Sequence, residues 1–231
     1  LDITVLRTWI LRCETEHHQY CGQTSSAGEC LPDEFILINV NKRCIVQAPR
    51  NPRFVALSYV WGTSNDQFRT SRKDLRARTS STSEPRVLLL LPDQPAQVIE
   101  NAILLVQALG EMYLWVDALC IIHDDVSHMT TQLNAMDSIY GFSLLTIIAA
   151  SGFSFNNHLP GYSTIPRSLQ SISGDVANSE FIVRLPPERA TIDGLSRSPW
   201  IHRAWTFQEG LLSKRRLIFT NQEVFFICRE D

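Results

Sequence analysis

The sequence lacks an apolar run long enough to cross a membrane. Its longest apolar stretches, residues 142–150 and 87–91, are far shorter than the roughly 20 residues that a membrane-spanning helix needs. The chain begins with Leu1, and no basic segment precedes a purely apolar one. We therefore expect no membrane partner, no signal peptide and no native start, and we interpret the chain as a piece excised from a longer protein.

The chain also lacks an excess of charge of one sign. Lys and Arg number 21 against 24 Asp and Glu, so the formal net charge is only -3. Such a balance gives no strong field towards nucleic acid or anionic lipid. We expect no nucleic-acid partner.

Cysteine is sparse, with six in 231 residues, which is too few for a secreted disulfide scaffold. Cys120 and Cys228 lie inside apolar runs, where a reduced thiol packs as a small hydrophobic group. A reducing compartment fits this pattern best, and we expect a cytoplasmic protein.

Common enzyme motifs are missing as well. The sequence has no Walker-type glycine loop, no Gly-x-Gly-x-x-Gly fingerprint and no His-Glu-x-x-His helix. Each motif holds a phosphate, a dinucleotide or a zinc ion in its class of enzyme. Their absence argues against ATPases, Rossmann dehydrogenases and zincin proteases.

What is present is the composition of a globular domain, with 44% hydrophobic and 19% charged residues. Residues 54–62, 113–122 and 144–150 have the short, continuous apolar pattern of buried strands. Helical periodicity occupies residues 98–109 and 129–140 between them, the second helix capped by Ser127. This alternation predicts an α/β fold with a mainly parallel open sheet flanked by helices.

The two ends of the chain add further elements. We predict an N-terminal extension, residues 1–50, with a helix, a turn containing cysteine and histidine, and a strand at residues 34–40. The main domain then spans residues 51–231 and ends in a β-hairpin. Residues 153–178, rich in Ser, Pro, Gly and Asn, are predicted to form a mobile loop.

Three sequence blocks, in this order, carry a resemblance to a known family: residues 56–62 (ALSYVWG), 114–121 (LWVDALCI) and 203–209 (RAWTFQE). They closely resemble the heterokaryon-incompatibility domain of filamentous fungi. Supporting similarity occurs at residues 136–140, 146–149, 211–213 and 225–228. Together the blocks cover most of residues 54–228.

The resemblance implies a domain of non-self recognition, found in larger proteins, whose activation leads to cell death through protein partners and self-association. The family is also distantly similar to Toll/interleukin-receptor (TIR) domains, some of which hydrolyse NAD with a glutamate on the helix after a central strand. This similarity implies TIR/flavodoxin-like character and NAD as a possible substrate. Where that glutamate is expected, however, the chain has Thr130, Thr131 and Gln132, and His123 replaces the usual glutamine. An amide cannot act as a general base or nucleophile.

A pocket is predicted beyond the carboxyl ends of the strands, because ligands bind there in parallel α/β sheets. Asp117 within an apolar strand must face a cleft, a cation or several donors, since a buried unpaired carboxylate is costly. Alternatively, Asp117 caps a loop or pairs with Arg203. The predicted ligand-binding residues are Ser58, Tyr59, Trp61, Gly62, Trp115, Cys120, Arg203, Trp205 and Gln208.

A last helix is predicted to begin with Ser198 as cap and Pro199 in its first turn. One face carries Trp200, Ala204, Phe207 and Leu211, and a separate stripe carries His202, Trp205 and Glu209. If the stripe lines the pocket, Trp205 stacks on a planar ligand while Asp117 and Glu209 act as the catalytic acid and base. Otherwise Trp205 packs on the loop and Glu209 pairs with an arginine at the surface.

The cysteines offer two further hypotheses. Cys13, His18 and Cys21 can bind a structural zinc ion if Cys44 or Cys30 supplies a fourth ligand; the alternative is free thiols in a polar turn. Cys120 with His123 can form a nucleophile and base, against the alternative of a packed thiol. For the whole chain, a catalytic domain competes with a non-catalytic scaffold that recruits proteins and with a nucleotide-binding module without turnover.

Overall fold

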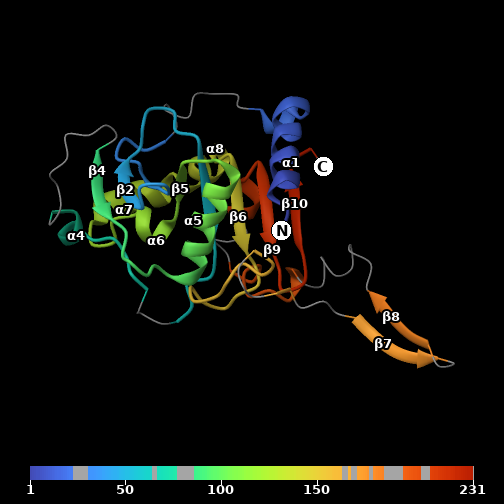
Figure 1. The fold of residues 1–231 in the computed structure, drawn as a ribbon. Helices are drawn as coiled ribbons and strands as arrows, with labels where there is room; N and C mark the ends of the chain where they lie inside the picture. Colours follow the sequence, from blue (N-terminus) through green and yellow to red (C-terminus); the bar gives the residue numbers. More distant parts are fainter. Residues whose placement is uncertain are drawn as a thin grey trace.

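The structure is a computed structural model, and it describes residues 1–22, 31–63, 67–76, 86–162, 166–167, 171–176, 179–184, 195–203 and 209–230. Its centre is a sheet of eight strands in the order β10-β9-β6-β3-β5-β1-β2-β4 (Figure 1). The strands are β1 (Ile36–Asn39), β2 (Cys44–Gln47), β3 (Phe54–Ser58), β4 (Val87–Leu90), β5 (Tyr113–Trp115), β6 (Leu145–Ala149), β9 (Arg215–Phe219) and β10 (Val224–Cys228). Two further strands, β7 (Ser171–Val176) and β8 (Ser179–Arg184), pair with each other in a second sheet.

The large sheet is parallel only in its middle. Strands β9, β6, β3 and β5 run parallel to one another, while β10 at one end and β1, β2 and β4 at the other pair antiparallel. The predicted α/β sheet and the C-terminal hairpin are therefore confirmed, but the prediction of a mainly parallel sheet was too strong. Strands joined by short turns, as in β1–β2 and β9–β10, can only pair antiparallel.

The helices are α1 (Ile3–Glu16), α2 (His18–Cys21), α4 (Arg72–Arg76), α5 (Gln97–Leu109), α6 (Asp117–Cys120), α7 (Val126–Asn134) and α8 (Met136–Phe142). Gly110 ends α5 with a left-handed φ of 84°, as the sequence predicts. The helix predicted over residues 129–140 is two helices, since the backbone leaves helical geometry at Ala135. Its N-cap is Asp125, which accepts a hydrogen bond from His128 N (3.0 Å), so the prediction of Ser127 as cap was wrong.

Of the strand predicted over residues 113–122, only Tyr113–Trp115 forms a strand, β5. β5 stops at Trp115, and the backbone amides of Leu119 and Cys120 then donate to the Val116 carbonyl (3.0 and 2.7 Å) to form α6. Continuous apolar character cannot distinguish a buried strand from a buried helical turn. Asp117 is therefore the first residue of a short helix and does not lie within a strand.

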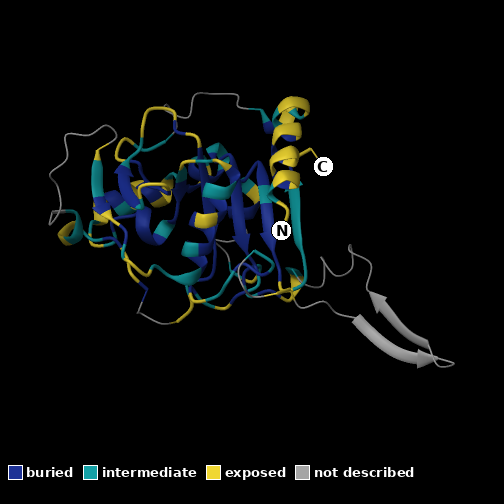
Figure 2. Cartoon of the chain, in the orientation of Figure 1, coloured by how far each residue is buried: buried dark blue, intermediate teal, exposed yellow. Residues whose placement is uncertain are grey.

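The core surrounds the parallel strands. Every residue of β3 and β6 is buried, which is the pattern of strands covered on both faces (Figure 2). One hydrophobic cluster includes Leu6 of α1, Ile38 of β1 and Leu217 of β9. Strands β1 and β2, from the predicted N-terminal extension, thus belong to the same sheet and core as the rest of the chain.

Helix α1 lies along β10, near both chain ends (Figure 1). Its outer surface is exposed, while Leu6, Ile10 and Cys13 face inward (Figure 2). Part of the predicted mobile loop, residues 153–178, lies outside the described residues, and its described part includes β7. Among the helices that the structure describes, none has the length and apolar character needed to cross a bilayer.

Candidate functional site

The carboxyl ends of β3 and β5 lie side by side and open into a pocket. The two strands are parallel neighbours, with Ala56 opposite Trp115, so Ser58 and Asp117 follow the same edge of the sheet. The pocket has a volume of about 290 Å³ and is lined by Tyr59, Trp61, Asp117, Ile121, His123, Met129, Leu133, Met136, Arg203 and Glu209. Two carboxyl groups and one guanidinium thus face a common space.

Glu209 is held by a buried hydrogen-bond network beneath the pocket. The Ser58 hydroxyl donates to Glu209 Oε2, and Trp200 Nε1 donates to Ser58 Oγ at 2.7 Å. Tyr140 also hydrogen-bonds to the Glu209 side chain. Ser58 is only 1% exposed and does not line the pocket, so it positions Glu209 and is out of reach of a ligand.

Asp117 accepts two hydrogen bonds, from Trp61 Nε1 (2.9 Å) and from the Ala118 amide (2.7 Å). Burial, followed by the negative charge of Glu209, raises the pKa of Asp117 from 3.8 to about 7. The two donors and Arg203 oppose this rise without cancelling it. Asp117 therefore exchanges a proton near neutral pH.

The two carboxyl groups titrate as a pair. Burial also raises the pKa of Glu209, but hydrogen bonds from Ser58 and Tyr140 and the charge of Arg203 act in the opposite direction. The negative charge of Glu209 is one cause of the raised pKa of Asp117, so the two carboxyl groups are electrostatically coupled. Near neutral pH Asp117 is about half protonated beside a second carboxyl group whose pKa is also raised.

The remaining polar side chains of this pocket also contact other parts of the chain. Arg203 Nη1 donates to the Tyr59 carbonyl (3.3 Å), and the Tyr59 hydroxyl contacts Gln67. The Trp61 ring lies edge-on to the His123 ring, with 5.6 Å between the ring centroids. His123 Nε2 donates to the Asp117 carbonyl (3.2 Å), and burial lowers the pKa of this imidazole, so it is neutral at physiological pH.

Sequence analysis missed the apolar wall of the pocket. Met129, Leu133 and Met136 lie on α7 and α8 and were predicted only as part of one helix, yet all three line the pocket, and Leu133 is 39% exposed. Their spacing of three and four residues indicated one helix face but could not show that this face borders a pocket. An apolar wall with a few convergent polar groups is typical of small-molecule sites.

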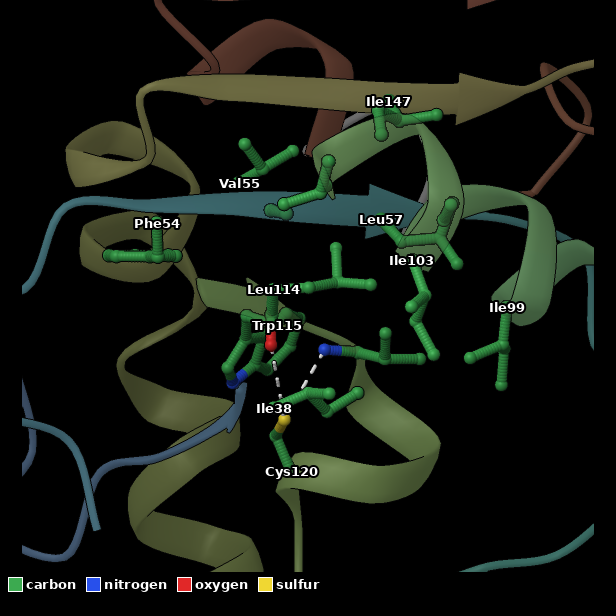
Figure 3. Packing of buried hydrophobic residues seen from close by; sticks show 14 of the residues in the cluster. Ile38, Phe54, Val55, Leu57, Ile99, Ile103, Leu114, Trp115, Cys120 and Ile147 are labelled. Carbon is green, nitrogen blue, oxygen red and sulfur yellow. Dashed lines mark hydrogen bonds between the residues drawn. The ribbon is translucent and has the colours of Figure 1, made fainter. Parts of the chain in front are cut away.

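Besides Ser58, three residues that were predicted to bind ligand do not line the pocket. Trp115 is completely buried, packed edge-on against Tyr140 at 5.6 Å. Cys120 is buried in the core, where its Sγ accepts from Val116 N (3.4 Å) and donates to the Leu114 carbonyl (Figure 3). Burial raises the pKa of Cys120 to about 12, so it cannot supply the thiolate of a nucleophile. Gly62 is exposed, with a left-handed φ of 80° that explains the glycine.

The predicted last helix differs from expectation where it is described. Ser198 Oγ accepts from Ile201 N (3.4 Å), but residues 199–203 form turns, and a helix is present at residues 209–212. Leu211, assigned to the buried face, is 61% exposed, while Glu209 is buried with only 7% exposed and His202 is exposed. Glu209 is therefore not a surface ion-pair partner. Ala204, Trp205, Phe207 and Gln208 lie outside the described residues.

Of the predicted zinc ligands that the structure describes, only two lie close to each other. Cys13 and Cys21 lie together, joined by His17 and Cys228. His18 is exposed, and Cys44 is on β2, six strands away from β10 in the sheet and so roughly 29 Å distant at about 4.8 Å per strand. Those two ligand assignments were wrong, and Cys30 lies outside the described residues.

Replacing Ser58 by alanine is expected to lower the free energy of unfolding by about 1–3 kcal/mol, because the buried Glu209 carboxyl and Trp200 indole lose their shared partner. Urea unfolding measures the change. Ser127→Ala, at an exposed position of α7, is the matched control and is expected to change stability by less than about 0.5 kcal/mol. Equal effects of the two substitutions would contradict the role given to Ser58.

Comparison with known proteins places the pocket within a family segment. The family model described as Heterokaryon incompatibility protein (HET) matches residues 54–209. Every residue that lines the pocket lies in this segment, and Glu209 is its last residue. Neither the search of curated proteins nor the search of solved structures found a match.

Proposed function

The chain belongs to the heterokaryon-incompatibility family, and on this premise we propose that it is a cytoplasmic cell-death effector domain that self-association activates to hydrolyse NAD or a related nucleotide. The carrying observation is that Asp117, whose pKa is raised to about 7, and Glu209 line one pocket. Enzymes that hydrolyse glycosidic bonds usually have two carboxyl groups in different environments, and these take the acid and base roles.

The pocket suits one end of a dinucleotide. Its volume of about 290 Å³ is at the lower limit for ligand sites, so it admits the nicotinamide riboside end rather than the whole molecule. The flat Trp61 ring and the Met129 and Met136 side chains offer surfaces for a planar base. Arg203 offers a cation for the neighbouring phosphate.

In the proposed reaction the bond between ribose C1′ and the nicotinamide nitrogen breaks, and its electron pair stays on nicotinamide. A water oxygen forms the new bond to C1′ and gives up a proton. The ionised Glu209 stabilises the positive charge that develops on the ribose, and Asp117 accepts the proton of the water. The products are nicotinamide, ADP-ribose and one proton.

The test is to incubate the concentrated, purified chain with NAD, with and without fusion to an oligomerising partner, and to measure nicotinamide by chromatography. Release is expected from the oligomerised chain and is expected to fall at least about 100-fold in Asp117→Asn, which cannot accept the proton. Asp137→Asn, an exposed aspartate on α8, is the matched control and should retain full release. No nicotinamide from the oligomerised chain would overturn the proposed hydrolysis.

A non-catalytic scaffold remains the second candidate, and a specific observation favours it. Val5 and Trp9, one turn apart on the same side of α1, are each 40% exposed and offer partner proteins an apolar surface. On that hypothesis Asp117 and Glu209 only stabilise the fold. A third function, nucleotide binding without turnover, predicts heat of binding in calorimetry but no nicotinamide.

A further inference from the structure

A second cluster of reactive side chains is formed by residues from the two ends of the chain, on either side of the pocket segment in the sequence. Cys13, His17, Cys21 and Cys228 each place one ligand atom so that all four atoms lie within 4.8 Å of one another. The three cysteines are 1% exposed, and none of the described cysteines forms a disulfide. All four residues lie outside the matched segment, residues 54–209, so the pocket and its chemistry do not account for them.

The local fold explains why these residues meet. Cys13, His17 and Cys21 are four residues apart, and the backbone continues helical hydrogen bonds from His17 N to Cys13 O and from Cys21 N to His17 O (both 3.2 Å). His17 lies at the break between α1 and α2, with φ -100° and ψ 61°, and these two hydrogen bonds keep Cys21 close to Cys13 across that break. Cys228, the last residue of β10, faces them because α1 lies along β10, where Trp9 contacts Phe226 at 6.0 Å between ring centroids (Figure 1).

We propose that Cys13, His17, Cys21 and Cys228 bind one structural zinc ion as a Cys₃His site. Zinc prefers four tetrahedral thiolate and imidazole ligands, with Zn–S bonds of about 2.3 Å and Zn–N bonds of about 2.0 Å. Such a tetrahedron separates its ligand atoms by roughly 3.5–3.8 Å. The distance of 3.2 Å between His17 Nδ1 and Cys228 Sγ is already close to this range, and the 4.8 Å limit of the cluster requires only small side-chain movements.

Arg215 gives a second, independent argument for the site. Its buried positive charge needs a negative partner, and a zinc ion bound by three thiolates is negative overall. This arginine is 5% exposed, and its guanidinium donates to Cys13 Sγ (3.0 Å), to the Cys21 carbonyl (3.3 Å) and to the Leu144 carbonyl (3.2 Å). No ion pair within the described residues includes it. A buried guanidinium is costly without a negative partner.

Zinc binding would provide that partner. One Zn²⁺ with three thiolates and a neutral imidazole has a net charge of minus one, which balances the single positive charge of Arg215. The hydrogen bond from Arg215 Nε to Cys13 Sγ is then a contact that orients the thiolate and stabilises its charge. The ion would join α1 and α2, before the matched segment, to β10, which follows it.

The first measurement is the metal content of the purified, reduced chain by plasma mass spectrometry, with about one zinc per chain expected. Cys228→Ala and His17→Ala are each expected to reduce zinc retained after dialysis at least tenfold, because their ligands complete the tetrahedron. The matched controls are Cys44→Ala, a buried cysteine on β2, and His18→Ala, the exposed neighbour of His17. Both controls should retain one zinc.

X-ray absorption at the zinc edge of the wild-type chain keeps the proposal testable if the ligand variants do not fold. Three sulfur atoms at about 2.3 Å and one nitrogen at about 2.0 Å are expected. A different ligand set, a folded chain that takes up no zinc, or a disulfide among Cys13, Cys21 and Cys228 would overturn the proposal. Retention of zinc by both His17→Ala and Cys228→Ala would overturn it as well.

Discussion

Glu209→Gln is expected to reduce nicotinamide release from NAD by at least about 100-fold while the chain stays folded. The neutral amide cannot stabilise positive charge on the ribose as a carboxylate does. Glutamine keeps the length of the side chain and retains an oxygen that accepts the hydrogen bond of Ser58. The loss of activity should therefore exceed any loss of stability.

The same substitution is expected to move the pH dependence of the remaining activity. In the wild-type chain the rate should rise as pH increases through about 7, because Asp117 must lose its proton to act as a base. Removing the charge of Glu209 removes one cause of the raised Asp117 pKa, so the midpoint should move to lower pH. Initial rates of nicotinamide release between pH 5 and about pH 9 measure both effects.

Expression of the variants in cells distinguishes catalysis from scaffolding. Glu16→Gln changes a glutamate with 55% side-chain exposure, paired with Arg12, and serves as the matched control. Under the proposed function Glu209→Gln abolishes killing and Glu16→Gln does not. Killing that persists in a folded Glu209→Gln chain would show that this carboxylate is not needed, and the scaffold would then be the better explanation.

Sequence patterns predicted most of the central fold because its strands are buried on both faces. The apolar runs that became β3 and β6 could not occur in exposed strands, and the left-handed Gly110 ended α5 as expected. Strand β2, which pairs with β1 across a short turn, was not predicted. Strand β4 was not predicted either, since its partner β2 lies about 40 residues earlier in the chain. Local pattern contains no information about such a partner.

The candidate site was predicted in part for a similar reason. Asp117, Tyr59, Trp61, Arg203 and Glu209 line one pocket, because parallel neighbouring strands must end at the same edge. The position of Cys120 depended on whether the chain continued as a strand after Trp115, and the helical turn α6 placed it in the core, while Trp115 itself ends β5 and is buried there. His17 and Cys228 were missed as a cluster because 211 residues separate them in sequence.

The second large effect is a pH dependence of stability that Asp117 introduces. Its pKa is about 7 in the folded chain and 3.8 as an ordinary aspartate, so the folded state binds this proton more tightly than the unfolded state. The stabilisation is complete below pH 3.8 and is lost as pH rises towards 7. At about 1.4 kcal/mol for each unit of pKa, the rise from 3.8 to about 7 corresponds to at most about 4 kcal/mol, since Asp117 is partly exposed to solvent in the pocket.

Asp117→Asn should isolate the pH-dependent contribution of Asp117 to the free energy of unfolding, because asparagine has no proton to lose. The free energy of unfolding of the variant minus that of the wild type is expected to increase between pH 4 and about pH 8, by up to about 4 kcal/mol. Urea unfolding at several pH values measures the difference. For Asp137→Asn, the difference from the wild type should not vary with pH. The increase should be smaller in a Glu209→Gln background, which lacks the charge that helps to raise the Asp117 pKa. A difference for Asp117→Asn that does not vary with pH would mean that folding leaves the pKa of Asp117 unchanged, and the proposed proton acceptor would then be no stronger a base than an ordinary aspartate.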